Sequence, residues 1–160
     1  MTTRQQMIAK IISNNIVKEE DEIIEELQQK LNSAIKNKEV LTSSNKKNEE
    51  YYKLLEEIDI NIKYRKAMLQ MWKIKKLYNQ TIVRCSNDCI MDANKVKNNK
   101  IILEKLKIRH QEYAYEALAE HAVLVEHYDY SEKSHLDLSE HLMCYVKKFN
   151  TAYERFINDF

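Results

Sequence analysis

The middle of the chain carries its most regular pattern of apolar residues. Leu55, Ile62 and Leu69 recur at intervals of seven, and Ile58 and Trp72 follow at spacings of three from members of that series. A seven-residue repeat with apolar positions three and four apart is typical of a helix that packs one seam against another helix. The pattern therefore predicts a long helix in this region, part of it a coiled coil.

Arg65 interrupts this seam. A charged residue at such a position can set the register of helix pairing or meet an acidic residue of a partner. Alternatively, its aliphatic stem packs in the seam while its guanidinium group reaches solvent. The sequence leaves both interpretations open.

Apolar residues at helical spacing also predict helices on either side of this region. The first stripe lies within residues 1–41 and contains Ile24, Leu27, Leu31, Ala34 and Leu41. A further stripe, within residues 96–126, contains Val96, Leu103, Leu106, Tyr113, Ala117 and Leu124. The last stripe, within residues 131–160, contains Leu138, Leu142, Tyr145, Phe149, Ala152 and Phe156. So wide an aromatic stripe has to be buried against something, in this chain or in another.

Three polar stretches are the places where we expect the helices to end: residues 42–48, 85–88 and 127–131. The chain has no glycine and no proline, so the turns have to be built from Ser, Asn and Asp, which favour caps and turns. In the first stretch we expect a bend or a left-handed Asn, and in the third Ser131 is the expected N-cap.

The predicted fold class is therefore all-α. We expect an N-terminal helix over residues 1–41 and central coiled-coil helices over residues 49–126, with a turn near 85–88. A C-terminal amphipathic helix follows over residues 131–160. One straight helix cannot bury these stripes, so the chain has to fold back as a helical hairpin or bundle, or else pair with partner helices.

Few candidate sites of chemistry emerge. Without glycine the chain cannot form a phosphate-binding loop, a dinucleotide fingerprint or a nucleophile elbow. Cys85 and Cys89 lie four residues apart on one predicted helix face, but the second ligand pair of a zinc site is missing. No two of the five histidines are four residues apart. We therefore expect a protein that is not an enzyme and that has no metal site and no cofactor.

Cysteine use and the start of the chain bear on location. The segment MTTRQQMIAK lacks the apolar core of a secretory signal, and no apolar run approaches the length of a membrane span. Three cysteines, an odd number, fit a reducing compartment. The expectation is an intracellular protein that does not contact membranes.

Charge is unevenly distributed although the net charge is only +1. Residues 61–110 contain thirteen Lys and Arg against three Asp and Glu, whereas residues 111–143 contain one Lys against eight Asp and Glu. Opposed blocks favour an antiparallel fold-back or a partner with the opposite pattern. The basic block is also a candidate for sequence-independent contact with nucleic-acid phosphates. Its candidate residues are Lys63, Arg65, Lys66, Lys73, Lys75 and Lys76.

Residues 107–119, KIRHQEYAYEALA, resemble a stretch of the THO complex subunit 7 family. In that family a basic run meets Gln-Glu-Tyr and then a Tyr-acid-Ala-Leu-Ala block. The two blocks share one Tyr in the family, whereas here they are separate. NEEYYKLLEEIDINI at 48–62 is similar to the preceding helix of the family, and His127 and Asp129 resemble its His-Pro-Asp turn with Tyr128 in place of the proline. The resemblance covers about half the chain and implies a nuclear coiled-coil subunit of an assembly that packages and exports mRNA, with no catalytic residues.

The leading interpretation is a non-catalytic coiled-coil subunit of a larger multiprotein assembly, nuclear if the resemblance holds and otherwise cytoplasmic. Its partners would be helical proteins or further copies of the chain. The residues predicted to bind them lie on the central seam and the C-terminal stripe: Leu55, Ile58, Ile62, Leu69, Trp72, Leu142, Phe149 and Phe156. The alternatives are a helical nucleic-acid-binding protein that uses residues 61–110 and a stand-alone helical bundle adaptor.

Overall fold

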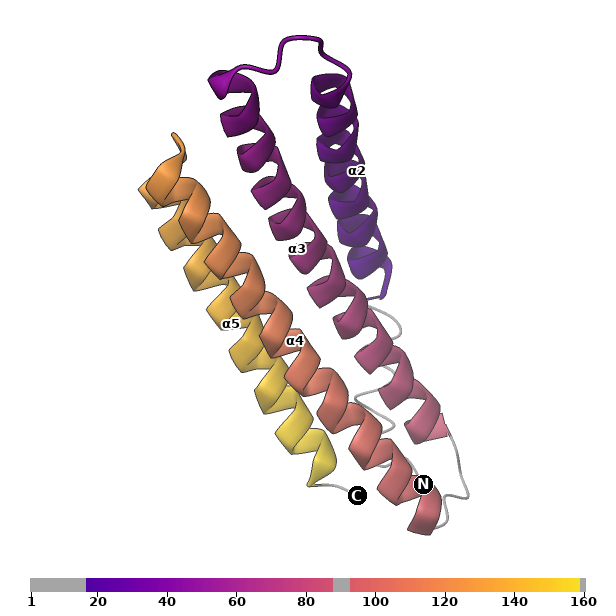
Figure 1. The fold of residues 1–160 in the computed structure, drawn as a ribbon. Helices are drawn as coiled ribbons and strands as arrows, with labels where there is room; N and C mark the ends of the chain where they lie inside the picture. The colour runs from indigo at the N-terminus through magenta and orange to yellow at the C-terminus, as the bar shows by residue number, and fades with distance from the viewer. Residues whose placement is uncertain (1–16, 88–92, 159–160) are drawn as a thin grey trace.

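The computed structural model describes residues 17–87 and 93–158, and within these ranges it contains four α-helices and no strand. They are α2 (Val17–Thr42), α3 (Glu49–Asn87), α4 (Ala93–His127) and α5 (Glu132–Ile157). Each helix runs back alongside the one before it, so neighbours along the chain are antiparallel (Figure 1). The predicted all-α, folded-back class is confirmed.

The two longest helices, α3 and α4, form the central pair of the bundle. α2 packs on α3 and α5 packs on α4, so α2 and α5 flank the pair (Figure 1). Three fully buried alanines, Ala67 of α3 and Ala114 and Ala117 of α4, lie in the core. Small side chains allow helices to approach closely, because the interaxial distance depends on the residues at the contact.

One core cluster joins all four helices. Leu27 and Leu31 come from α2, Leu69 from α3, Ala117 from α4 and Leu142 from α5. A second, smaller cluster lies where the C-terminal parts of α3 and α5 meet the N-terminal part of α4. It consists of Tyr78, Ile82, Cys85, Leu103, Phe149 and Phe156. The apolar stripes of the sequence therefore meet one another inside this chain.

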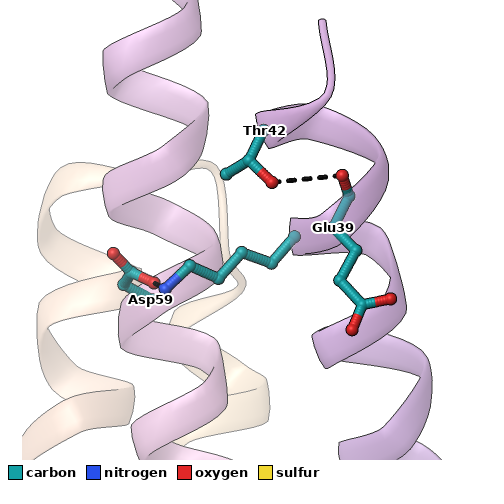
Figure 2. Close-up of polar contacts among 4 residues, drawn as sticks. Glu39, Thr42 and Asp59 are labelled. Atoms are coloured by element: carbon teal, nitrogen blue, oxygen red, sulfur yellow. Dashed lines mark hydrogen bonds and ion pairs between the residues drawn. The ribbon is translucent and has the colours of Figure 1, made fainter.

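The connection between α2 and α3 lies at residues 43–48, within the stretch expected to break the helix. The Thr42 hydroxyl donates to the Glu39 carbonyl oxygen at 3.1 Å (Figure 2), and the Ser43 hydroxyl donates to the Val40 carbonyl oxygen at 2.8 Å. On the other side, the Asn48 side chain accepts a hydrogen bond from the Tyr51 amide at 2.9 Å, as an N-cap does. The polar residues thus satisfy backbone groups that the helix ends leave without partners.

Positive φ is absent from this connection and from the other described residues. The bend that we expected as one option is therefore what forms, without a left-handed Asn.

An ion pair joins α2 to α3 near this connection. The Lys38 ammonium of α2 lies 2.8 Å from the Asp59 carboxylate of α3 (Figure 2).

The last connection joins α4 to α5 at residues 128–131. Ser131 is the N-cap of α5: its backbone is extended, and its hydroxyl oxygen accepts a hydrogen bond from the Ser134 amide at 3.3 Å. This prediction is confirmed. A turn was expected near residues 85–88, but α3 continues through residues 85–87. Residues 88–92, which include Cys89, lie outside the described residues. Residues 1–16 of the predicted first helix lie outside them as well.

Candidate interaction surfaces

The residues predicted to bind a partner lie mostly in the core of this chain. Ile62, Leu69, Trp72 and Leu142 belong to the first cluster, and Phe149 and Phe156 to the second. Leu55 and Ile58 are half-buried. The other helices of the bundle already cover these faces, so any contact they make with a partner stays a prediction.

The six basic residues proposed for nucleic acid fall into two groups, and three of them already make contacts within the chain. Lys76 pairs with Asp21 of α2 at 2.6 Å. The Lys75 ammonium lies 4.7 Å from the centre of the Trp72 ring and 5.6 Å from that of Tyr145. The Arg65 guanidinium lies 5.3 Å from the Tyr64 ring centre and lines a groove between α2 and α3. Arg65 is half-buried, which fits the interpretation that its stem packs in the bundle.

The other three, Lys63, Lys66 and Lys73, are exposed along one face of α3. We call this the basic face of α3; it comprises Lys63, Lys66, Gln70, Lys73, Leu77, Gln80 and Arg84. All seven are exposed, and the alternating spacing of three and four keeps them on one side of the helix over about 32 Å. None of its four cations pairs with a carboxylate among the residues that the structure describes.

An apolar row lies on the outside of α4. Ile101, Ile108 and Tyr115 are 42%, 47% and 48% exposed, and seven residues separate each from the next. Leu103 and His110, each two positions further along, are buried, because two residues turn a helix by about 200°. We call these three residues the outer row of α4. The seven-residue spacing of this row is present in the sequence, but the spacing alone cannot tell an exposed row from a buried one.

Two histidines far apart in sequence meet between α4 and α5. The Nδ1 atoms of His121 and His135 are 2.9 Å apart, and the two ring planes differ by only 7°. The ring centres are 5.1 Å apart, farther than the nitrogens, so the rings meet edge to edge. In a hydrogen bond between them, one nitrogen has to donate and the other has to accept. The accepting nitrogen carries no hydrogen, so at least one of the two rings is neutral.

The surroundings of His121 oppose its protonation. Burial, the neighbouring His135 and the Arg65 guanidinium lower the pKa of His121 below its usual value. The Tyr64 ring lies 5.2 Å from the His121 ring and the Tyr130 ring 6.2 Å away. Fourteen residues separate the two histidines, so no local spacing rule could have paired them.

A second buried histidine, His110, stacks on Phe149 with ring centres 4.3 Å apart and planes differing by 13°. Burial, with a smaller effect of the Lys75 charge, lowers the pKa of His110 to about 4. Near neutral pH it is therefore an uncharged ring in the core, and its surroundings are those of a packing residue.

Glu20 is a buried carboxyl group near the start of α2. Its Oε1 accepts a hydrogen bond of 2.6 Å from the Asn79 side chain of α3. Burial raises the pKa of Glu20 above its usual value, although Lys75 and the Asn79 hydrogen bond act in the opposite direction. This contact ties α2 to α3.

The described residues do not bring three or more His, Cys, Asp or Glu side chains together in an arrangement that could hold a metal ion. Cys85 is buried and Cys144 is exposed. The groove beside Arg65 is an open depression of about 450 Å³ whose walls are partly polar and partly apolar. None of the described helices combines the length and apolar character needed to cross a membrane.

Comparison with known proteins found no matching family model, no matching curated protein and no matching solved structure. A proposal about function therefore has to rest on the basic face of α3 and the outer row of α4.

Proposed function

We propose that this protein is a non-catalytic helical subunit of a larger protein assembly, and that it binds through helix faces which its own bundle leaves open. The outer row of α4 carries this proposal. Exposed apolar residues repeated every seven positions form the kind of surface on which another helix packs. Single exposed apolar residues are common on proteins, but three in register along one helix are a stronger indication of a binding surface.

The resemblance to THO complex subunit 7 supports a more specific proposal, in which the assembly packages and exports mRNA in the nucleus. The stretch that carries the resemblance, residues 107–119, lies within α4 and includes Ile108 and Tyr115 of the outer row. Under this proposal the residues that resemble the family are the ones available to a partner.

Affinity purification of the tagged full-length chain from its native cells tests the assembly role, with partners identified by mass. We expect stoichiometric protein partners, and we expect Ile108→Glu to remove at least one of them because it places charge in the middle of the outer row. Leu136→Glu is the matched control, since Leu136 is 66% exposed on α5. Purification of the chain without any stoichiometric protein, in wild type and variants alike, would rule the proposal out.

The basic face of α3 favours a second candidate function, contact with RNA or DNA phosphates. Lysines with no carboxylate partner in the described structure are free to neutralise phosphates, and such binding weakens as salt rises. Contacts to phosphates carry no sequence information directly, so we expect little dependence on nucleotide sequence.

Fluorescence anisotropy with a single-stranded RNA at low and moderate salt tests this candidate. The triple variant Lys63→Gln, Lys66→Gln, Lys73→Gln should weaken binding and reduce the slope of log affinity against log salt by about two. The control variant Lys36→Gln, Lys133→Gln, Lys147→Gln changes the charge equally at exposed lysines elsewhere and should bind like wild type. Equal loss in both variants would mean that net charge, and not this face, governs binding.

A further inference from the structure

The equal spacing of the outer row makes it self-complementary. Ile101 and Tyr115 lie seven residues on either side of Ile108. If two copies of α4 lie antiparallel with Ile108 on a two-fold axis, Ile108 faces Ile108 and Ile101 faces Tyr115. A two-fold interface has to match itself in this way, because each partner presents the same patch.

Charge along α4 selects this orientation. Residues 93–110 contain six Lys and Arg and one Glu, whereas residues 111–127 contain four Glu and no Lys or Arg. Parallel copies would place like charges together along the whole helix. Antiparallel copies place the basic half of one α4 against the acidic half of the other, which is favourable and also rejects the parallel arrangement.

The same charge pattern does not stabilise α4 as an isolated helix. A helix is stabilised by acidic residues near its N-terminus and basic residues near its C-terminus. α4 has no acidic residue in its first turn, and its lysines gather in its N-terminal half. An antiparallel second copy would supply carboxylates near that end, so the arrangement suits association better than it suits the isolated helix.

We propose that the outer row of α4 is the interface of a two-fold dimer, in which a second copy of this chain binds antiparallel with Ile108 at the centre. The inference rests on the part of the proposed function that makes the outer row a binding surface, and it names the occupant of that surface. Three half-exposed side chains per copy form a small apolar core compared with stable dimers. We therefore expect a dissociation constant of about 1–100 µM that rises with salt.

Sedimentation equilibrium of the full chain over a range of concentrations tests association. Wild type should shift from monomer to dimer, and Ile108→Arg should weaken the dimer by about tenfold or more because two cations then meet on the axis. Leu136→Arg, the same kind of change at a more exposed residue of α5, should leave the constant unaltered. Circular dichroism checks that each variant remains helical, which we expect because Ile108 is 47% exposed. A wild-type chain that stays monomeric at every concentration would overturn the inference.

Disulfide trapping tests the orientation, in a background of Cys89→Ser and Cys144→Ser. Ile108→Cys alone should form a cross-linked dimer, because its Cα atoms meet on the axis. Ile101→Cys and Tyr115→Cys should cross-link only when the two variants are mixed. Leu136→Cys is the control and should not cross-link. Cross-linking of Ile101→Cys with itself, and none in the mixture, would indicate a parallel arrangement and contradict the proposal.

These outcomes separate the dimer from the assembly role. A monomeric chain whose stoichiometric partner in cells is another protein, lost in Ile108→Glu, overturns the dimer and leaves the proposed function standing. A dimer that assembles with no other protein supports the inference and removes the proposed role in a larger assembly.

Discussion

Phe149 shows how single aromatic residues join helices in this bundle. Its ring centre lies 4.4 Å from that of Tyr78 on α3 and 4.3 Å from that of His110 on α4. Aromatic pairs at such distances add to the free energy of burying the rings. One side chain of α5 therefore contacts both central helices.

Replacing Phe149 with Ala should lower the free energy of unfolding by about 3–5 kcal/mol, because it removes a buried ring and leaves a cavity among three helices. Urea unfolding followed by circular dichroism measures the change. Leu136→Ala removes an exposed side chain of α5 and should change stability by less than about 0.5 kcal/mol. Similar values for the two variants would show that Phe149 is not packed as described.

Protonation of His110 should make stability depend on pH. Its pKa is about 4 in the folded protein against about 6.5 when unfolded. Between these values the unfolded chain binds more protons, so stability is fully present above pH 6.5 and is lost as pH falls toward 4. The full effect is about 3 kcal/mol.

Urea unfolding of wild type and His110→Gln between pH 7 and pH 5 checks this dependence. The variant should lose stability less steeply as pH falls, whatever its stability at pH 7. His141→Gln alters an exposed histidine and should keep the wild-type slope. An unchanged slope in His110→Gln would mean that the ring titrates normally.

At the scale of elements, the end of α2 and the starts of α3 and α5 are built from short-range hydrogen bonds. Asn48 and Ser131 cap α3 and α5 through their side-chain oxygens, and Thr42 and Ser43 donate to carbonyl groups at the end of α2. Each of these contacts joins residues three positions apart. These three helix ends therefore lie where the sequence places Ser, Thr and Asn.

Ser131→Ala should lower the free energy of unfolding by about 1 kcal/mol, because the Ser134 amide loses its acceptor. Ser131→Asp should retain most of the stability, since Asp is also a good N-cap and its charge favours the start of a helix. Thermal unfolding measures both variants. Ser134→Ala, which keeps the amide donor, serves as the control, and an equal loss there would argue against the cap.

At the scale of the whole molecule, the bundle is assembled mainly from contacts between helices that follow one another in the chain. α2 packs on α3, α3 on α4 and α4 on α5. Local topology of this kind brings contacting residues together without closing long loops. The shared core then joins all four helices into one unit.

The bundle should accordingly fold rapidly, within about a millisecond at 25 °C in water. Stopped-flow or temperature-jump fluorescence of Trp72, which is buried against Tyr145, measures the rate. The protein concentration should be low enough that the chain is monomeric. The kinetics should then show one phase whose rate does not change on dilution. A dominant phase slower than about one second would show that formation of the core requires a step beyond local helix packing.

The sequence determined the helices, two of the three expected breaks between them and the apolar faces, because these depend on residues within one or two turns of each other. Ser131 as a cap and the break after Thr42 follow from such local rules, and so does the seam through Ile62 and Leu69. A periodic pattern says that a face is apolar without saying what covers it. Most of the predicted partner-binding residues are therefore found packed inside this chain.

Only the tertiary structure decided what depends on distant residues. It joined His121 to His135, turned Lys75 and Lys76 toward other helices, and left Lys63, Lys66 and Lys73 exposed on the basic face of α3. It also left the outer row of α4 uncovered. These outcomes depend on which helix lies beside which, and that is set by packing among segments tens of residues apart.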